Sequence, residues 1–455
     1  MEPLKPLIIS RADHNISRRS LSPNAVKVLY RLKDNGFTAY LVGGGVRDLL
    51  LGREPKDFDI VTDATPLQIK KMFRNCRLIG RRFRLAHLHF QDEIIEVATF
   101  RSARLDDVPA EEPAAMDESE GHTLTGRSPL LLKSEDGMVL RDNIFGTPAE
   151  DAVRRDFTVN ALAYNISDFS LIDYVGGLDD LQRGVIRTIG DSGIRFVEDP
   201  VRMIRAVRFA AMLGFRVEET TWQAILELSP TVTKASPPRL YEEVLKLFLL
   251  GAGERTYQLL RQSGIFSALF PHFNDWLERE SDGFPHTWVG KALDHLDIAI
   301  QNGEKVQPPL LFALMFSQYL QEKAESFRKA GLPAHPAVNA AVAEFMGEVA
   351  PTVQFPNRVA ILIRDILTSQ HRLRKIPGRH PETFATRHGF AEALSYLRFA
   401  SAITGEDKKV LAWWEKFQLE PQSDIQRWGT PAKTSTTQET KEKNFGKTRC
   451  MNPRS

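Results

Sequence analysis

A glycine triplet between two short apolar runs is the feature that most constrains the fold of this chain. Residues 41–66 read LVGGGVRDLLLGREPKDFDIVTDATP. The run TAYLVG predicts a strand, VRDLLLG predicts a short helix, and DFDIV predicts the next strand. Because glycine has no Cβ, the backbone N–H groups of a strand-to-helix turn can approach a phosphate closely. The segment therefore predicts an α/β unit with an anion-binding turn at Gly43, Gly44 and Gly45.

Two acidic residues follow the turn at a spacing typical of a metal site. Asp57 and Asp59 are two residues apart, and in a strand such residues point to the same face. Their carboxylates can converge on metal ions, which in two-metal sites lie about 3.5–4 Å apart. Mg²⁺ is usually held by one or two carboxylates and substrate phosphates. An isolated Asp-x-Asp pair is more often a pair of surface charges, but the glycine turn, with Arg47 placed to contact a triphosphate, favours the metal site.

Two residues are candidates for a third acidic ligand. Glu96 lies in the predicted strand EIIEVATF, which could stand beside the strand of the two aspartates. Asp156 lies in AVRRDFTVNALAYN. Each also has an ordinary structural explanation, because Glu96 could face solvent and Asp156 could cap the following helix. The residues alone do not rank the two.

The composition limits the class of protein. A chain of 455 residues predicts two to four modules, and 42% hydrophobic with 26% charged residues is typical of soluble globular proteins. The net charge is +2, so any nucleic-acid surface must be local. No apolar run reaches about 18 residues, and the first twenty residues lack the continuous apolar stretch of a secretory signal. Cys76 and Cys450 have no metal-ligand spacing, and together these features predict a cytoplasmic protein.

The chain changes character along its length. Strand and helix patterns alternate at first, and long amphipathic helices follow from about residue 191. We expect a flexible N-terminal arm over 1–20, an α/β head over 21–190 with a flexible acidic insertion at 105–137, a helical neck over 191–265, a helical body over 266–420, and a disordered, modestly basic tail over 421–455.

The first long helix of the neck carries two distinct faces. Asp199 and Pro200 predict its N-terminus. At about 100° per residue, one broad face collects the apolar residues Met203, Ile204, Ala206, Val207, Ala210 and Ala211. The opposite side carries a stripe formed by Arg202, Arg205 and Arg208. Such a stripe can present guanidinium groups to a base or to phosphates, or it can pair with acidic neighbours.

Three separated motifs together resemble one enzyme family. LVGGGVRDLLLGREPKDFDI, RRDFTVNALAYN and EDPVRMIRAVRFAAMLGF resemble, in the expected order, the nucleotidyltransferase family of bacterial poly(A) polymerases and class II CCA-adding tRNA nucleotidyltransferases. The resemblance covers most of residues 20–270 and is loose beyond them. GRRFRLAHLHFQDEIIEVATFR, which includes Arg81, Arg82 and Arg84, and LRDNIFGTPAEDAVRRDFT are similar to the poly(A) polymerase branch.

The resemblance implies a fold and a set of site residues. The fold is an α/β nucleotidyltransferase head, similar to that of polymerase beta, followed by an all-α neck and body. The catalytic acids would be Asp57, Asp59 and Asp156, with the third acid falling on Asp156 rather than on Glu96, and Asp57 and Asp59 would hold two Mg²⁺ ions. The nucleotide-binding residues would be Gly43, Gly44, Arg47, Arg155, Asp199, Arg202 and Arg205, of which Asp199 and Arg202 would read the edge of the incoming base, with Arg205 alongside.

The resemblance also implies an activity. It is the template-independent transfer of AMP from ATP to RNA 3′ ends, in RNA processing and decay. The partners would be RNA 3′ ends and ATP, with RNA-decay or RNA-chaperone proteins as candidate protein partners, and the chain would be a monomer. The alternative is the CCA-adding activity, which the modestly basic tail keeps open because poly(A) polymerases of this family usually end in an Arg/Lys-rich tail. Arg81, Arg82 and Arg84 are also compatible with either substrate. A non-catalytic RNA-binding protein would be expected to lose the acidic residues or the glycines, and both are intact.

Three further segments have weaker signals. Trp413 and Trp414 could stack on RNA bases, although core packing is the better explanation for at least one of them. The basic segment 371–380 is a comparable candidate for RNA contact. The group Asp294-His295-x-Asp297 is similar to a metal-hydrolase motif, but its isolation predicts an ordinary cluster on a helix surface.

Overall fold

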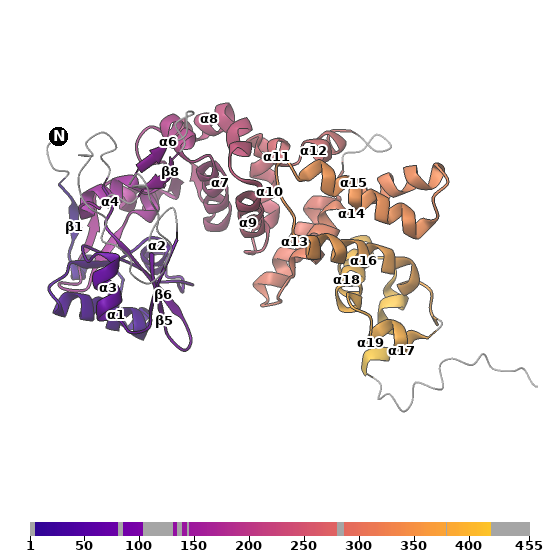
Figure 1. The fold of residues 1–455 in the computed structure, drawn as a ribbon, viewed down its shortest axis with the longest axis horizontal. Helices are drawn as coiled ribbons and strands as arrows, with labels where there is room; N and C mark the ends of the chain where they lie inside the picture. The colour runs from indigo at the N-terminus through magenta and orange to yellow at the C-terminus, as the bar shows by residue number, and fades with distance from the viewer. Residues whose placement is uncertain are drawn as a thin grey trace, which may run out of the picture.

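The protein has an α/β head at one end and a helical neck and body that extend away from it (Figure 1). The computed structural model describes residues 5–80, 85–102, 131–133, 139–142, 145–279, 286–378 and 380–419. Arg81, Arg82, Arg84, most of the acidic insertion and the basic tail lie outside these residues. The expectations for them stay predictions.

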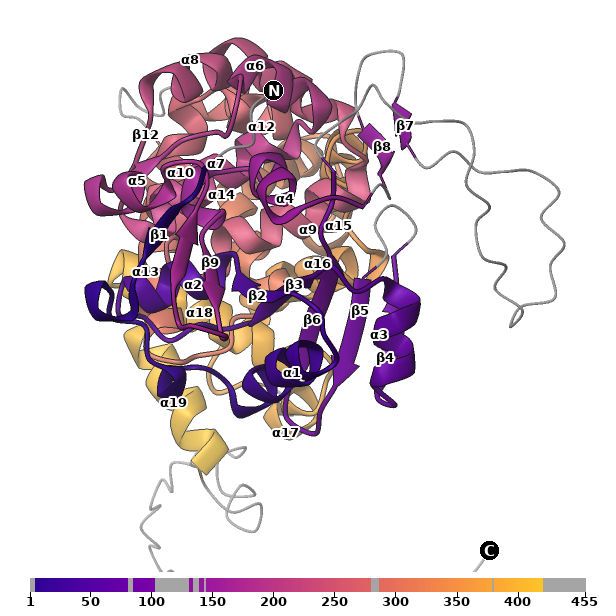
Figure 2. The same ribbon diagram turned by 90° about the vertical axis from the view of Figure 1, so that its left-hand side faces the viewer.

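The head is built on a mixed sheet in which a single pair of neighbouring strands is parallel. The strands, in spatial order, are β1 (Leu7–Ile9), β10 (Leu171–Asp173), β9 (Ala163–Asn165), β2 (Ala39–Val42), β3 (Asp59–Thr62), β6 (Ile94–Thr99), β5 (Leu85–His89) and β4 (Cys76–Ile79). Only β3 and β6 pair in parallel within this sheet. Figure 2 views the molecule from the side of the head. The predicted strand at DFDIV thus lies at the centre of the sheet.

The N-terminal segment differs from the expected loose arm over residues 1–20. Residues 7–9 form the edge strand β1, which pairs antiparallel with β10. Ile16 is buried in the head core. The apolar run at this strand is too short for a sequence pattern to indicate it, and the free edge of β10 supplies the pairing that makes it a strand.

Short helices pack around the sheet. They are α1 (Pro23–Asp34), α2 (Gly44–Leu50), α3 (Pro66–Met72), α4 (Pro148–Arg154) and α5 (Gly177–Arg183). Side chains at the N-cap position cap three of them, α1, α3 and α4. Thr65 and Thr147 begin α3 and α4 with reciprocal capping boxes, each followed by proline at the first helical position. The smaller elements are β7 (Leu131–Lys133), β8 (Val139–Asp142), β11 (Val185–Ile186), β12 (Arg216–Val217), η1 (Arg11–Asp13), η2 (Arg18–Ser20), η3 (Thr158–Asn160) and η4 (Ser229–Lys234).

The neck begins with α6 (Ser192–Glu198) and α7 (Val201–Leu213) and continues through α8 (Glu219–Leu228), α9 (Pro237–Phe248) and α10 (Gly253–Gln262). The apolar face predicted for the first long helix is confirmed, because all six of its residues are buried in α7. Arg208 is buried as well, and its Nη1 lies 3.0 Å from Glu243 Oε2 on α9. The carboxylate of Glu243 on another helix therefore compensates the charge of Arg208, so that one residue of the arginine stripe can be buried in the core.

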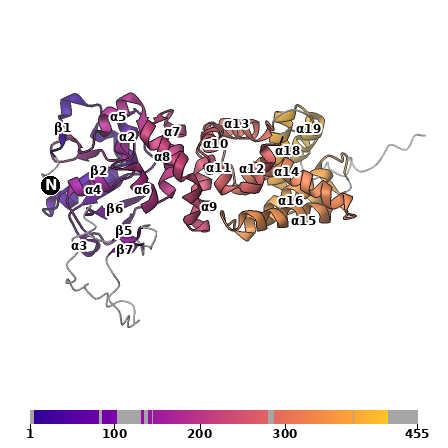
Figure 3. The ribbon, with the colours of Figure 1, turned by 90° about the horizontal axis from the view of Figure 1, so that it is seen from above.

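The body consists of helices packed along their lengths (Figure 3). They are α11 (Ile265–Leu269), α12 (Pro271–Leu277), α13 (Trp288–Gln301), α14 (Pro308–Lys329), α15 (Ala334–Val349), α16 (Asn357–Leu373), α17 (Pro381–Ala385), α18 (Phe390–Thr404) and α19 (Lys408–Leu419). One hydrophobic core runs from the head into the body, and a second small core lies under α19. In the second core Trp414 is fully buried and donates from Nε1 to the Leu373 carbonyl, so core packing is confirmed for this tryptophan.

No helix within the described ranges combines the length and the apolar character that a bilayer span requires.

The group at 294–297 on α13 is only partly the surface cluster that its isolation predicts. Asp294 is exposed, but Asp297 is buried. Its two carboxylate oxygens accept hydrogen bonds from the backbone N–H groups of Gly253 and Glu254 at 2.7 and 2.9 Å. Asp297 therefore caps the N-terminus of α10 from another helix, a role that no local sequence pattern reveals.

We expect Asp297→Ala to destabilise the protein by about 1–3 kcal/mol, because two buried N–H donors would lose their acceptor. The free energy of unfolding from urea titration checks this value. Asp294→Ala, on the exposed side of the same helix, is the matched control and should stay within about 0.5 kcal/mol of the parent. Equal effects of the two substitutions would contradict the capping role.

Candidate active site

The glycine turn joins β2 to α2 and lies against the acidic residues. Gly43 has φ +76° and ψ −145°, a conformation that side chains rarely tolerate. A Cβ at this position would lie 3.4 Å from Asp59 Oδ2 and 3.6 Å from Arg155 Nη1. A Cβ at Gly45 would lie 3.1 Å from the Asp57 carbonyl oxygen. The turn is therefore packed against the loop and strand that carry the two aspartates.

Strand register brings Asp59 and Glu96 together. Asp59 is the first residue of β3 and lies opposite Glu96 on the parallel neighbour β6. Asp57 differs from the expectation, because it precedes the strand and is exposed. Glu96 is half-exposed, with Oε1 3.1 Å from His87 Nε2. The three acidic residues lie where β3 begins, at the end of the central strands next to the glycine turn, and we call this group of Asp57, Asp59 and Glu96 the carboxylate edge.

The electrostatics of Asp59 reflect this crowding. Burial, the Glu96 carboxylate and the Asp57 carboxylate raise the pKa of Asp59 to about 6, against the opposing effect of Arg155. Both the burial and the two neighbouring carboxylates disfavour the ionised form of Asp59. A bound cation would favour the ionised form.

Asp156 occupies a different environment. Its Oδ2 accepts from Arg205 Nε at 2.7 Å, and Oδ1 accepts from the Phe157 N–H at 2.9 Å. Burial opposes ionisation of this carboxyl, but Arg205, Arg202 and the hydrogen bonds from Asn160 and Phe157 hold its pKa below the ordinary value. None of the described contacts of Asp156 reaches Asp57 or Asp59. The structure therefore places Glu96, and not Asp156, beside Asp59.

The described part of the chain holds no group of three or more His, Cys, Asp or Glu side chains that could hold a metal ion by themselves. The carboxylates of Asp57, Asp59 and Glu96 therefore do not form a complete metal site. A cation at this edge would need further oxygen ligands from a substrate.

The base-reading residues implied by the resemblance are held by partners from other elements. Asp199 lies between α6 and α7, and its Oδ1 and Oδ2 accept hydrogen bonds from Nη1 and Nη2 of Arg239 on α9 at 2.9 and 2.7 Å. Arg202 donates to Glu198 Oε2 at 3.1 Å and to the Arg195 carbonyl at 2.8 Å. Each side chain is therefore fixed in one orientation by charge-assisted hydrogen bonds.

Arg47 supports the glycine turn from behind. Its guanidinium is buried, lies 2.7 Å from Asp48 and donates to Asn160 Oδ1 at 2.8 Å. A Cβ at Gly44 would lie 3.4 Å from Arg47 Nη2. The guanidinium also lies over the Phe209 ring, 5.2 Å from its centroid. This arginine therefore shapes the turn from a buried position.

A concentration of arginines lies next to these residues. Burial and neighbouring guanidinium groups lower the pKa of Arg154 to about 9, and the pKa values of Arg101 and Arg195 are lowered as well. Arg155 is paired with Asp151 at 2.9 Å. The site therefore combines a carboxylate edge with an arginine-rich wall, which suits a ligand that carries several negative charges together with a cation.

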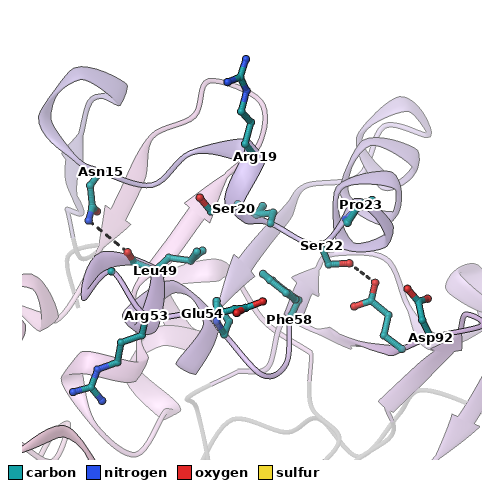
Figure 4. Close-up of a pocket in the computed structure, with 14 residues that line it drawn as sticks. Asn15, Arg19, Ser20, Ser22, Pro23, Leu49, Arg53, Glu54, Phe58 and Asp92 are labelled. Carbon is teal, nitrogen blue, oxygen red and sulfur yellow. Dashed lines mark hydrogen bonds between the residues drawn. The ribbon is translucent and has the colours of Figure 1, made fainter.

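A separate pocket of about 680 Å³ opens behind the loop that precedes β3 (Figure 4). Phe58, Arg53 and Glu54 from this loop line it, together with Asn15 and Arg19 from the N-terminal segment. It does not include the two aspartates that flank Phe58 in sequence. The pocket is distinct from the carboxylate edge.

Three residues of the site had no assigned role in the sequence analysis. Arg239 lies 40 residues after Asp199, and no pattern connects the two. Asn160 belongs to the motif RRDFTVNALAYN, which is a signal for the segment but not for this side chain. Phe209 follows the apolar face of α7 and is indistinguishable in sequence from an ordinary core residue.

Three family profiles match the chain. The one described as poly A polymerase head domain matches residues 39–187. The one described as probable RNA and SrmB-binding site of polymerase A matches residues 214–277, and polymerase A arginine-rich C-terminus matches residues 330–451. The first profile contains the glycine turn and all the acidic candidates.

Individual proteins are similar over different lengths. Poly(A) polymerase I of Salmonella typhi is 44% identical over 414 residues, which cover 90% of this chain and 85% of that protein. A CCA-adding enzyme of Leuconostoc mesenteroides is 34% identical over 56% of both chains. The crystal structure of the Bacillus stearothermophilus CCA-adding enzyme in complex with CTP is similar with a TM-score of 0.57 and 25% identity, over 91% of this chain and 90% of that chain. The likeness to poly(A) polymerase I extends well beyond residue 270, further than the motifs indicate.

We expect Gly43→Ala to destabilise the protein by about 1–2 kcal/mol, because a positive φ is costly for a residue with a Cβ. Gly36→Ala is the matched control, since Gly36 has φ +84° with nothing within 4 Å of an added Cβ. Both variants should therefore lose similar stability in urea titration. Only Gly43→Ala should disturb Arg155 and Asp59, which nuclear magnetic resonance of the Asp59 carboxyl can detect as an altered pKa. An unchanged pKa would contradict the close approach of turn and carboxylate.

Proposed function

The chain belongs to the poly(A) polymerase family, and we propose that its site catalyses polynucleotide adenylyl transfer, in which AMP from ATP is added without a template to the 3′ end of RNA. The observation that carries the proposal is the 44% identity to poly(A) polymerase I across head, neck and body. In this reaction the RNA 3′ oxygen forms a bond to the α-phosphorus of ATP. The bond from that phosphorus to the bridging oxygen breaks, and pyrophosphate leaves with the electron pair.

Divalent cations are assigned to the carboxylate edge. The donors are oxygen atoms, which Mg²⁺ prefers, and burial together with two neighbouring carboxylates raises the pKa of Asp59 there. When bound, two Mg²⁺ ions would favour ionisation of the RNA 3′-hydroxyl and neutralise charge on the departing pyrophosphate. Asp57 and Asp59 would hold them, with the remaining oxygen ligands from the triphosphate.

The motif resemblance implies Asp156 as the third acid, but Glu96 suits this role better. Its strand register places it opposite Asp59, whereas both oxygens of Asp156 already accept hydrogen bonds. Asp156 would instead hold Arg205 of α7 in position, so that it serves the nucleotide-binding side of the site.

The triphosphate would lie between the glycine turn and the arginines. Gly43 and Gly44 stand at the start of α2, where the first backbone N–H groups have no partner within the helix, and Arg155 lies beside the turn. Arg47 keeps the turn in shape from its buried position. Little covalent chemistry is asked of these residues, because positioning and charge stabilisation supply most of the rate enhancement in phosphoryl transfer.

The base of ATP would be read by side chains of the neck. Asp199 and Arg202 provide a hydrogen-bond acceptor and donors, with Arg205 alongside, and Arg239 and Glu198 fix their orientation. A pair of groups fixed in this way favours one base edge over others, because a mismatched base would leave buried polar groups unpaired. This rigidity suits a polymerase that adds a single kind of nucleotide.

The RNA would reach this site along the helical neck and body. The match to the RNA-binding profile at residues 214–277 supports RNA contact in the neck. Residues 371–380 stay a proposed contact in the body, whereas Trp414 is buried and Trp413 stacks on Phe417 at 5.4 Å. We place the enzyme in the cytoplasm, as a monomer in RNA processing and decay, with RNA-decay or RNA-chaperone proteins as candidate partners.

Extension of two end-labelled RNAs tests the activity. With Mg²⁺ and ATP alone, the enzyme should build a long ladder on an unstructured oligonucleotide, and removal of Mg²⁺ with a chelator should abolish it. A tRNA lacking its CCA end, offered CTP and ATP, distinguishes the alternative. Growth that stops after three nucleotides and requires CTP would instead establish the CCA-adding activity.

Matched substitutions test the carboxylates. Asp57→Asn should lower the rate of AMP addition by about 10²-fold or more, and Glu96→Gln by about 10- to 100-fold with a higher Mg²⁺ requirement, because each removes an anionic oxygen ligand. Asp156→Asn should instead raise the KM for ATP without changing the Mg²⁺ dependence.

Glu93→Gln, in the loop before β6, is the control for the acidic strand and should retain the parent rate. A shifted Mg²⁺ dependence in Asp156→Asn, with none in Glu96→Gln, would return the third acid to Asp156.

A further inference from the structure

A chain of hydrogen bonds connects the glycine-turn helix α2 to the nucleobase helix α7. Arg47 on α2 donates to Asn160 Oδ1 at 2.8 Å. Asn160 Nδ2 in turn lies 3.4 Å from Asp156 Oδ1. The other oxygen of Asp156 lies 2.6 Å from Arg205 Nη2 on α7. One amide side chain thus stands between the arginine behind the turn and the carboxylate that holds the neck.

Asn160 is itself rigidly held. Its side chain is almost completely buried, with a relative exposure of 5%. Its N–H donates to the Phe157 carbonyl at 3.0 Å, and its own carbonyl accepts from Arg155 Nη1 at 3.4 Å. The backbone of η3 therefore fixes the position from which the amide reaches both neighbours.

The chemistry of this position favours an amide. A single side chain must accept from a guanidinium on one side and donate to a carboxylate on the other. A carboxamide can do both, whereas a carboxylate only accepts and an apolar residue does neither. Since Arg47 and Asp156 are both removed from bulk water, an unpaired group at either end would be costly.

Phe209 provides a second contact between the same two arginines. Its ring centroid lies 5.2 Å from the Arg47 guanidinium and 5.7 Å from that of Arg205. The ring also meets Phe157, the residue after Asp156, edge-on at 5.8 Å. The amide and the ring therefore fix the same spacing between α2 and α7 from two directions.

We propose that Asn160 is a positioning residue that ties Arg47, and with it the glycine turn, to Asp156 and Arg205 on the nucleobase side. The inference rests on the proposed function, since the two ends are assigned to the triphosphate and to the base of ATP. Asn160 touches neither. It makes the two halves of the nucleotide site act as one unit, so that a change at one end weakens binding at the other.

The test uses the full-length enzyme with Asn160→Ala and Asn160→Asp. The first removes both hydrogen bonds, and the second keeps an acceptor for Arg47 but places a negative charge beside Asp156. We expect both to raise the KM and the dissociation constant for ATP by about tenfold, with a much smaller change in kcat. The affinity for RNA measured without ATP should stay within about twofold of the parent.

A double-mutant cycle distinguishes positioning from packing. Arg205→Lys weakens the other end of the chain, and its effect on ATP binding should be less than multiplicative with that of Asn160→Ala. A lowered melting temperature with unchanged ATP affinity, or strictly multiplicative effects, would overturn the proposal. Asn160→Asp preserves side-chain size, so it carries the test if Asn160→Ala does not fold.

Asn165→Ala is the matched control, because the Asn165 side chain accepts only from the Ser167 N–H among the described contacts. It should bind ATP as the parent does. The dissociation constants use ATP alone and no RNA. A parent enzyme that binds ATP with this coupling but fails to extend RNA would therefore reject the proposed function and leave the positioning role intact.

Discussion

The site depends on an imbalance of charge that the fold concentrates at one edge of the sheet. Parallel pairing of β3 with β6 sets Asp59 opposite Glu96. Burial in the first place, and the Glu96 and Asp57 carboxylates in addition, raise the pKa of Asp59 to about 6. A few ångströms away, the glycine turn and Arg155 present positive charge. Asp151 partly neutralises Arg155, but the described contacts provide no cation that neutralises all three carboxylates. A polyphosphate with its cations would carry positive charge to the carboxylates and negative charge to the turn, which is why the geometry suits nucleotidyl transfer.

The neck completes the site by contact with the head and not by its own helices alone. Arg205 of α7 is held by Asp156 of the head, whereas Arg208 is held by Glu243 of α9. Asp199 is held by Arg239, also of α9. The Asp156–Arg205 pair therefore links the neck to the head, whereas the other two pairs hold the start of α7 and α7 itself against α9. Breaking one partner of the buried Arg208–Glu243 pair would leave an uncompensated charge. The ion pairs that hold the helices together are thus the same contacts that orient the proposed base-reading side chains.

The helical body shows how far a family resemblance extends beyond its catalytic motifs. The head and neck motifs are short and chemically constrained, because phosphate, metal and base each need particular groups. The helices of the body pack through apolar faces that many different sequences can provide. A single sequence therefore gives little evidence of the family to which the body belongs. Comparison with poly(A) polymerase I carries the likeness through these helices.

Local chemistry was enough to predict much of this protein. The strand–turn–helix unit, the α/β head, the apolar face of α7 and the membership of the family all follow from residues close together in sequence. Other features follow from pairing between distant segments. Residues 7–9 form a strand because they pair with the free edge of β10. Strand register places Glu96 beside Asp59, whereas Asp156 contacts Arg205 of α7. Asp297 became a helix cap, and Asn160 and Arg239 gained partners, for the same reason. Periodicity and turn chemistry determine each element, but only packing decides which side chains meet across elements.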